Sequence, residues 1–118
     1  MNELKRKEAV FEDLTKIVLR RSKIEQWIDE PFFTETMLNS FVRVGFSQKY
    51  IIAQIRDIKD DEKNSYILAN GKKTGVYFKL LLTEDSHDKL KWFKINQISN
   101  QEISRQEFEK LRMYRKHF

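Results

Sequence analysis

The stretch LRRSKIEQWIDEPFFTETMLNSFVRVGF, residues 19–46, decides the fold of this chain. It begins with a pair of arginines, the second of which is Arg21, and passes through an amphipathic segment to a Pro-Phe-Phe corner. It ends in an alternating run, residues 41–46, which predicts a strand with Arg43 on the face opposite the valines. Because a charge in so apolar a strand needs water or a partner, we hypothesise that Arg21 and Arg43 converge on one anionic group.

Helices are predicted on both sides of the Pro-Phe-Phe corner. Residues 3–18 predict a weak amphipathic helix before it. Ser22 and Glu25 form an S-x-x-E capping box, which predicts a second helix with its N-cap at Ser22 and Arg21 just outside it. A third, short helix is predicted over about residues 31–38, opened by its proline.

Each of the two arginines also has a plain structural explanation, and the sequence leaves both explanations open. Arg21 can be a solvated residue beside a helix start, since basic residues are mostly exposed. Arg43 can be an outward-facing residue of an ordinary strand. In favour of an anion site, a helix N-terminus presents unpaired N–H groups and the positive end of the helix dipole.

The rest of the chain predicts strands and one closing helix. Apolar runs predict further strands over residues 49–58, 65–69, 76–82 and 90–98. An Asn-Gly turn joins the second and third of these. Ser104 and Glu107 form another capping box, which starts the closing helix. The predicted fold is therefore α+β, with about five short antiparallel strands in a small half-open barrel flanked by helices.

Composition narrows the function classes. The 118 residues predict a single domain, 1–118. The lack of cysteine excludes disulfides, thiolate metal sites and cysteine nucleophiles. The net charge of +5 permits an anionic partner without requiring one. We expect neither a membrane span nor a signal peptide, because no apolar run is long enough; a nuclear or cytosolic monomer is the expectation.

Catalytic and cofactor motifs are weak in this sequence. His87 lies in a polar turn and His117 next to the C-terminus, and neither has the spacing of a metal ligand. The segment 70–75 lacks the Gly-Lys-Ser/Thr run of a phosphate-binding loop, so it is predicted to be a hairpin turn. We therefore expect a protein that is not an enzyme and that needs no metal or cofactor.

Basic residues alternate with aromatic residues on three predicted strands. Single-stranded nucleic-acid binders use this combination, in which rings stack on bases and cations pair with phosphates. The same aromatic residues also build the cores of small barrels, which is the simpler explanation for most of them. The three segments are Lys49-Tyr50, Tyr77-Phe78-Lys79 and Lys91-Trp92-Phe93-Lys94.

The order and spacing of several stretches resemble the Plus3 domain of the Rtf family. The matching stretches are LRRSKIEQWIDEPFF, SFVRVGF, YIIAQI, YILANGKKTG and FKINQISNQEISRQEFEKL, which span about residues 16–115. The resemblance implies a Tudor-like half-barrel flanked by N-terminal helices and a C-terminal helix, which agrees with the fold predicted from the residues.

The resemblance also implies a function in the nucleus. Family members are associated with the RNA polymerase II Paf complex and bind the phosphorylated C-terminal repeats of the large subunit of DSIF, the elongation factor related to NusG. This contact tethers the Paf complex to the elongating polymerase. Binding of single-stranded DNA is also attributed to the family, and remains the alternative function.

Site residues follow from the matched positions. Arg21 and Arg43 match the basic residues that would grip the phosphothreonine, with the forked geometry in which guanidinium groups hold phosphate. Lys91 matches a further basic position on the last strand, and Lys94 lies close to it. Lys49 is a candidate substitute for a basic residue of the second strand.

Two positions depart from the family pattern. Ile51 stands where members often carry that basic residue of the second strand, and Gln97 where an aromatic residue often contacts the peptide. The affinity or the sequence preference for the peptide is therefore expected to differ. The chain also lacks the long flanks of a full-length member, so it is expected to be either an excised domain or a reduced protein.

Overall fold

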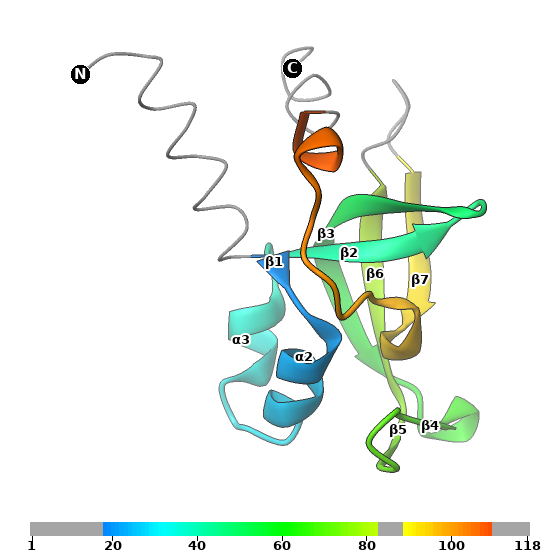
Figure 1. Ribbon diagram of the computed structural model, residues 1–118. Coiled ribbons are helices and arrows are strands. Elements are labelled where there is room, and N and C mark those ends of the chain that lie inside the picture. The colour runs from blue at the N-terminus through cyan, green and yellow to red at the C-terminus, as the bar shows by residue number, and fades with distance from the viewer. Residues whose placement is uncertain (1–17, 83–88, 110–118) are drawn as a thin grey trace.

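The computed structural model describes residues 18–82 and 89–109 (Figure 1). The helix predicted over residues 3–18 falls almost wholly outside these ranges, as does the later part of the closing helix. No helix within the described residues is long and apolar enough to span a membrane. The elements, in chain order, are β1 (Val18–Leu19), α2 (Arg21–Trp27), α3 (Phe33–Met37), β2 (Phe41–Phe46), β3 (Lys49–Asp60), the 3-10 turn η1 (Glu62–Asn64), β4 (Tyr66–Ile67), β5 (Lys73–Thr74), β6 (Val76–Leu82), β7 (Lys89–Lys94) and the 3-10 turn η2 (Ile95–Gln97).

The main sheet has five strands in the order β1-β2-β3-β6-β7. Strands β2, β3, β6 and β7 form an antiparallel meander, while β1 pairs with β2 in parallel. The sheet does not close into a barrel, but the chain after η2 returns to β2 through a single bridge between Val44 and Ile98. The α+β fold and the half-open arrangement predicted from the sequence are thus confirmed (Figure 1).

Strand predictions were accurate where the alternation was clean and wrong where a turn intervened. Strands β2 and β6 have the predicted bounds. The last strand stops at Lys94 instead of continuing to residue 98, because Lys94 N–H donates to the Gln97 side chain and the chain turns into η2. The turn after the Asn-Gly pair is shorter than predicted, since Lys73–Thr74 already pair with Tyr66–Ile67 as a small hairpin.

Two apolar clusters lie on opposite faces of the sheet. On the inner face, the even-numbered residues of β2 pack with Phe78 of β6 beneath α2 and α3, whose Ile24 and Phe33 join the same cluster. On the outer face, Phe41 and Ile52 pack with three residues from β1 and from the segment after η2, namely Val18, Ile103 and Phe108. The segment after η2 therefore covers the outer face of β2, which is the face that carries Arg43.

The capping of α2 differs from the sequence prediction. The N-cap is Arg20, with Arg21 as the first helical residue, and no side chain at the N-cap position forms a hydrogen bond. The prediction of Ser22 as the N-cap was therefore wrong. Instead, Ser22 N–H donates to Oδ1 of Asn100 at 3.0 Å, across 78 positions of sequence. A residue of the segment after η2 thus supplies the acceptor that local capping would have supplied.

Replacement of Asn100 by alanine is expected to lower the free energy of unfolding by about 1 kcal/mol, the usual effect of losing a helix cap. Ser22→Ala is the matched control, because its hydroxyl does not cap α2, and should change stability by less than about 0.5 kcal/mol. Urea denaturation followed by circular dichroism measures both. A larger loss for Ser22→Ala than for Asn100→Ala would contradict the observed cap.

Candidate anion-binding site

Arg21 and Arg43 bind neighbouring residues because two different segments pair with the same edge of β2. Strand β1 pairs with the start of β2, and Ile98 bridges to Val44 further along that edge. Arg21, two residues beyond β1, therefore lies beside the Ile98–Ser99 segment. Its backbone N–H donates to the Ser99 carbonyl and its Nη1 to the Ile98 carbonyl, both at 3.3 Å.

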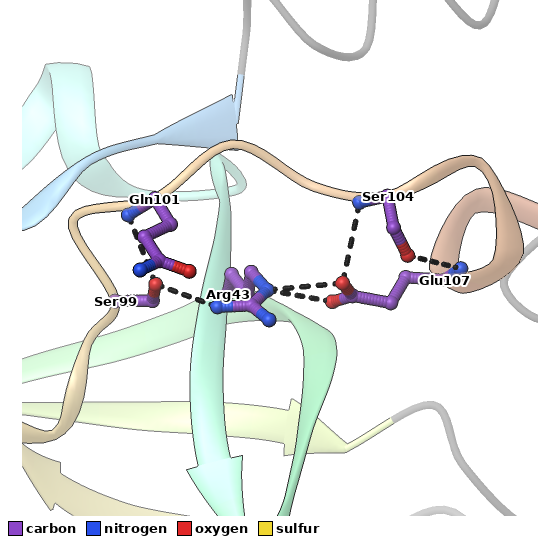
Figure 2. Close-up of polar contacts among 5 residues, drawn as sticks. All are labelled: Arg43, Ser99, Gln101, Ser104 and Glu107. Carbon is purple, nitrogen blue, oxygen red and sulfur yellow. Dashed lines mark hydrogen bonds and ion pairs between the residues drawn. The ribbon is translucent and has the colours of Figure 1, made fainter.

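Arg43 reaches the same segment from the outer face of β2, as Figure 2 shows. Its Nη1 donates to Ser99 Oγ at 2.7 Å, and Ser99 N–H donates to the Arg43 carbonyl at 2.7 Å. On the other side, its Nε donates to both carboxylate oxygens of Glu107, at 2.8 and 3.1 Å. The two arginines therefore bind adjacent residues, Ile98 and Ser99. Their convergence on one anionic group stays a prediction.

Glu107 both caps the closing helix and forms an ion pair with Arg43. Its Oε1 accepts from the backbone N–H of Ser104, while its own N–H donates to Ser104 Oγ, so the capping box predicted from the sequence is present. The same carboxylate forms the ion pair with Arg43, in which the two side chains are only 14% and 15% exposed. The pair is nearly buried and thus fixes the closing helix against β2.

A tyrosine ring completes the surroundings of Arg43. The guanidinium carbon of Arg43 lies 4.1 Å from the ring centroid of Tyr50, which is a stacking distance for a cation on an aromatic ring. Tyr50 pairs with Gly45, and a Cβ added to Gly45 would lie 3.5 Å from the Tyr50 ring. The ring thus packs beside the strand at Gly45, and about half of Tyr50 stays exposed.

Arg21 also has a carboxylate beside it. Its Nε lies 3.5 Å from Oε1 of Glu25, one helical turn further along α2. The Glu25 side chain is 8% exposed and its Oε1 has no hydrogen bond within the described residues. The sequence motifs identified Glu25 and Glu107 only as capping residues and gave no sign that each arginine lies beside a carboxylate. The i, i+4 spacing of Arg21 and Glu25 was the available signal.

The structure does not bring the three predicted lysines to the arginines. Lys49 pairs with Phe46 across β2 and β3, on the inner side of the sheet. The ammonium of Lys91 lies 5.0 Å from the Phe46 ring. Both therefore lie on the face of the sheet opposite to the one that carries Arg43. Lys94, at the other end of β7, lies 5.5 Å from the ring of Tyr66. Whether these lysines bind a ligand stays a prediction.

The two positions that depart from the family pattern have defined structural places. Ile51 is buried in the inner cluster, where it pairs with Val44. Gln97 is exposed, and its Oε1 accepts from the Lys94 N–H that begins η2. A cation at position 51 would have to enter the apolar core in this chain, so its replacement by isoleucine fits the local packing.

A second surface combines lysines with aromatic rings on the outer face of β3, β6 and β7, and Tyr66 of β4 adjoins it. The Lys59 ammonium lies 4.4 Å from the Trp92 ring and 5.4 Å from Tyr77, and Lys79 lies 5.8 Å from Trp92. Tyr77 in turn packs edge-on against Tyr66 at 5.3 Å. We call this set the lysine–aromatic strip; its members are Lys59, Tyr66, Tyr77, Lys79, Trp92 and Lys94.

Tyr66 anchors one end of this strip. Its hydroxyl donates to the Val76 carbonyl and accepts from the Ile95 N–H. Burial raises the pKa of Tyr66 to about 12, with a smaller contribution from the neighbouring Tyr77, while the Ile95 hydrogen bond acts in the opposite direction. The phenol therefore stays protonated at neutral pH and keeps donating to Val76.

Comparison with known proteins assigns the chain to a family. The family model of the Plus-3 domain matches residues 13–115, almost the whole chain. The chain belongs to the Plus-3 domain family. One relative, "Protein RTF1 homolog" of Arabidopsis thaliana, is 34% identical over 77 residues, which is 60% of this chain. This Plus-3 domain matches only 12% of that relative's length. The resemblance stated from the sequence is thereby confirmed.

Proposed function

We propose that this Plus-3 domain acts in transcription elongation as a non-catalytic module that binds a phosphothreonine peptide. The peptide would be a C-terminal repeat of the DSIF/NusG-type elongation factor, and the contact would tether the Paf complex to RNA polymerase II in the nucleus. The observation that carries the proposal is the meeting of Arg21 and Arg43 at Ile98–Ser99. Two guanidinium groups at one place suit a phosphate, because charge-assisted hydrogen bonds to phosphate are strong.

The hydrogen bonds that the arginines already form leave donors for a ligand. The Nη2 groups of Arg21 and Arg43 have no hydrogen-bond partner among residues 18–82 and 89–109. Arg43 is held from three sides by Ser99, Glu107 and Tyr50. A phosphate would therefore meet a preorganised guanidinium group, and the exposed side of Tyr50 would contact the peptide beside it.

The proposal predicts tighter binding of a phosphorylated peptide through this site. Fluorescence anisotropy with a threonine-containing repeat peptide, with and without the phosphate, should show at least about tenfold tighter binding of the phosphorylated form, the effect of a few charge-assisted hydrogen bonds. Single arginine variants would leave a carboxylate unpaired, so paired variants are needed. Arg21→Gln with Glu25→Gln, and Arg43→Leu with Glu107→Gln, should each remove most of the preference. Equal preference in wild type and both double variants would reject these residues as the phosphate site.

A second candidate function rests on the lysine–aromatic strip. Trp92 is 37% exposed, and the ammonium groups of Lys59 and Lys79 lie 4.4 and 5.8 Å from its ring. No carboxylate within the described residues pairs with these two lysines. Rings that carry unpaired cations suit single-stranded nucleic acid, whose bases stack while its phosphates pair with lysines.

One experiment distinguishes the two candidate functions. Trp92→Ala should weaken binding of a labelled single-stranded oligonucleotide about tenfold or more, since one stacked base is worth about 1–3 kcal/mol. The same variant should leave the phosphopeptide affinity unchanged, because Trp92 and Arg43 lie at different places on the sheet. Tyr50→Ala is the reciprocal control, which should affect only the peptide. Oligonucleotide binding that is unchanged by Trp92→Ala would reject the strip as the nucleic-acid surface.

A further inference from the structure

Glu107 is bound to Arg43, which the proposed function assigns to the phosphate. Its carboxylate accepts from Arg43 Nε through both oxygens and is 15% exposed. In the free domain, the charge of Arg43 is therefore already balanced. Glu25 lies beside Arg21, with its Oε1 at 3.5 Å from the Arg21 Nε and without a hydrogen bond within the described residues. The site thus offers an incoming anion two guanidinium groups whose positive charges are offset by carboxylates.

A phosphate bound to Arg43 would lie close to the Glu107 carboxylate. Both groups would bond to one guanidinium group, whose nitrogen atoms are only a few ångströms apart. Phosphate carries a charge near −2 at neutral pH, so the two anions repel each other while they share one cation. At about 5 Å, such repulsion lowers an affinity at least about tenfold, which is the effect in a high-dielectric surrounding.

We infer that Glu107 is a built-in competitor that sets the affinity of the phosphate site, an inference that rests on the proposed function. Its carboxylate holds Arg43 in place in the free domain, and it weakens the hold of Arg43 on a bound phosphate. The phosphopeptide is consequently released more readily than two unpaired arginines would allow. Because Glu107 also caps the closing helix through Ser104, the docking of that helix controls the charge available at Arg43.

Glu107→Gln removes the negative charge of this residue and keeps its cap on the closing helix. Glutamine serves equally in an S-x-x-E/Q capping box, so the contacts with Ser104 are kept. Its amide oxygen can still accept from Arg43 Nε, while the negative charge is removed. Glu102→Gln is the matched control, since Glu102 lies in the same segment but pairs with Arg20 at the surface, where both side chains are well exposed.

The test is the affinity of the wild type, Glu107→Gln and Glu102→Gln for the phosphorylated and unphosphorylated peptides at several salt concentrations. We expect Glu107→Gln to bind the phosphopeptide about tenfold more tightly, with a steeper salt dependence, and the unphosphorylated peptide as the wild type does. Glu102→Gln should change the phosphopeptide affinity by less than about twofold, since exposed ion pairs are worth little. Thermal unfolding with and without phosphopeptide is the second readout, and the bound peptide should raise the midpoint more in Glu107→Gln than in the wild type.

The outcomes distinguish this inference from the proposed function. If the wild type prefers the phosphopeptide but Glu107→Gln binds it equally or more weakly, Glu107 is only a structural partner of Arg43 and the inference is wrong. If neither protein prefers the phosphopeptide, the proposed function fails and the inference fails with it. A tenfold gain shared by Glu102→Gln would indicate a general effect of net charge, and would also overturn the role of Glu107.

Discussion

Replacing Arg43 alone by leucine is expected to lower the free energy of unfolding by about 3 kcal/mol, because it leaves the carboxylate of Glu107 nearly buried without its cation. The variant also removes the hydrogen bond to Ser99 Oγ that joins β2 to the segment after η2. Urea denaturation followed by tryptophan fluorescence measures the change.

The control for this prediction is the double variant Arg43→Leu with Glu107→Gln. It removes both charges while the glutamine keeps the cap with Ser104, so it should regain at least about half of the lost stability, as replacement of buried ion pairs by neutral groups usually does. If the double variant were as unstable as the single one, the loss would not come from an unpaired carboxylate. The ion pair would then not be the link between the closing helix and β2.

Replacing Phe78 by alanine is expected to cost about 3–5 kcal/mol, the largest effect of a single core substitution in this domain. Phe78 is fully buried in the inner cluster, pairs with Ile58 and Phe93 on its two neighbouring strands, and stacks on Phe33 of α3 at 6.1 Å. Its loss would open a cavity between the sheet and α3. Thermal and urea unfolding would measure the change.

Phe32→Ala is the matched control for Phe78→Ala. Phe32 is 43% exposed and packs edge-on against Trp27, with 5.9 Å between the ring centroids. Its removal should cost about 1 kcal/mol or less, since little apolar surface is uncovered. Equal losses for the two phenylalanines would show that Phe78 does not link the sheet to α3 as the structure has it.

The sequence predicted the fold where the signals were local. The alternation in residues 41–46 and 76–82 gave both strands with their observed bounds, because one face of each strand is buried in the inner cluster. The capping box of Ser104 and Glu107 involves residues only three positions apart, so it too was predicted correctly. Ser22 and Glu25 match the same motif, but Asn100 caps α2 from a distant segment.

The candidate site could be predicted only in part, for a similar reason. The contrast between Arg43 and its apolar neighbours indicated that this charge needs a partner. The structure places both arginines on the Ile98–Ser99 segment, while their shared anion stays a prediction. The partner within the chain is Glu107, 64 positions away. No periodicity connects the two residues, because the pairing depends on how the closing segment crosses the outer face of β2.

The predicted lysines show the limit of assigning roles along a strand. Successive residues of a strand point to opposite faces, so a shift of one position places a cation on the other side of the sheet. Lys49 and Lys91 lie on the inner side near Phe46, and Lys94 lies near Tyr66. A resemblance in sequence order does not show on which face of the sheet each lysine lies, whereas the pairing register does.

The central claim is that Arg21 and Arg43 together hold a phosphate. The most direct measurement is a nuclear magnetic resonance titration that follows the Nε–Hε signals of these two arginines and the amide of Ser99. The phosphorylated repeat peptide should shift all three signals, whereas the unphosphorylated peptide and the Arg43→Leu/Glu107→Gln variant should show little change. If the phosphopeptide instead shifted the signals of Lys59, Tyr77 and Trp92 while both arginine signals stayed in place, the lysine–aromatic strip would be the binding surface and the claim would be contradicted.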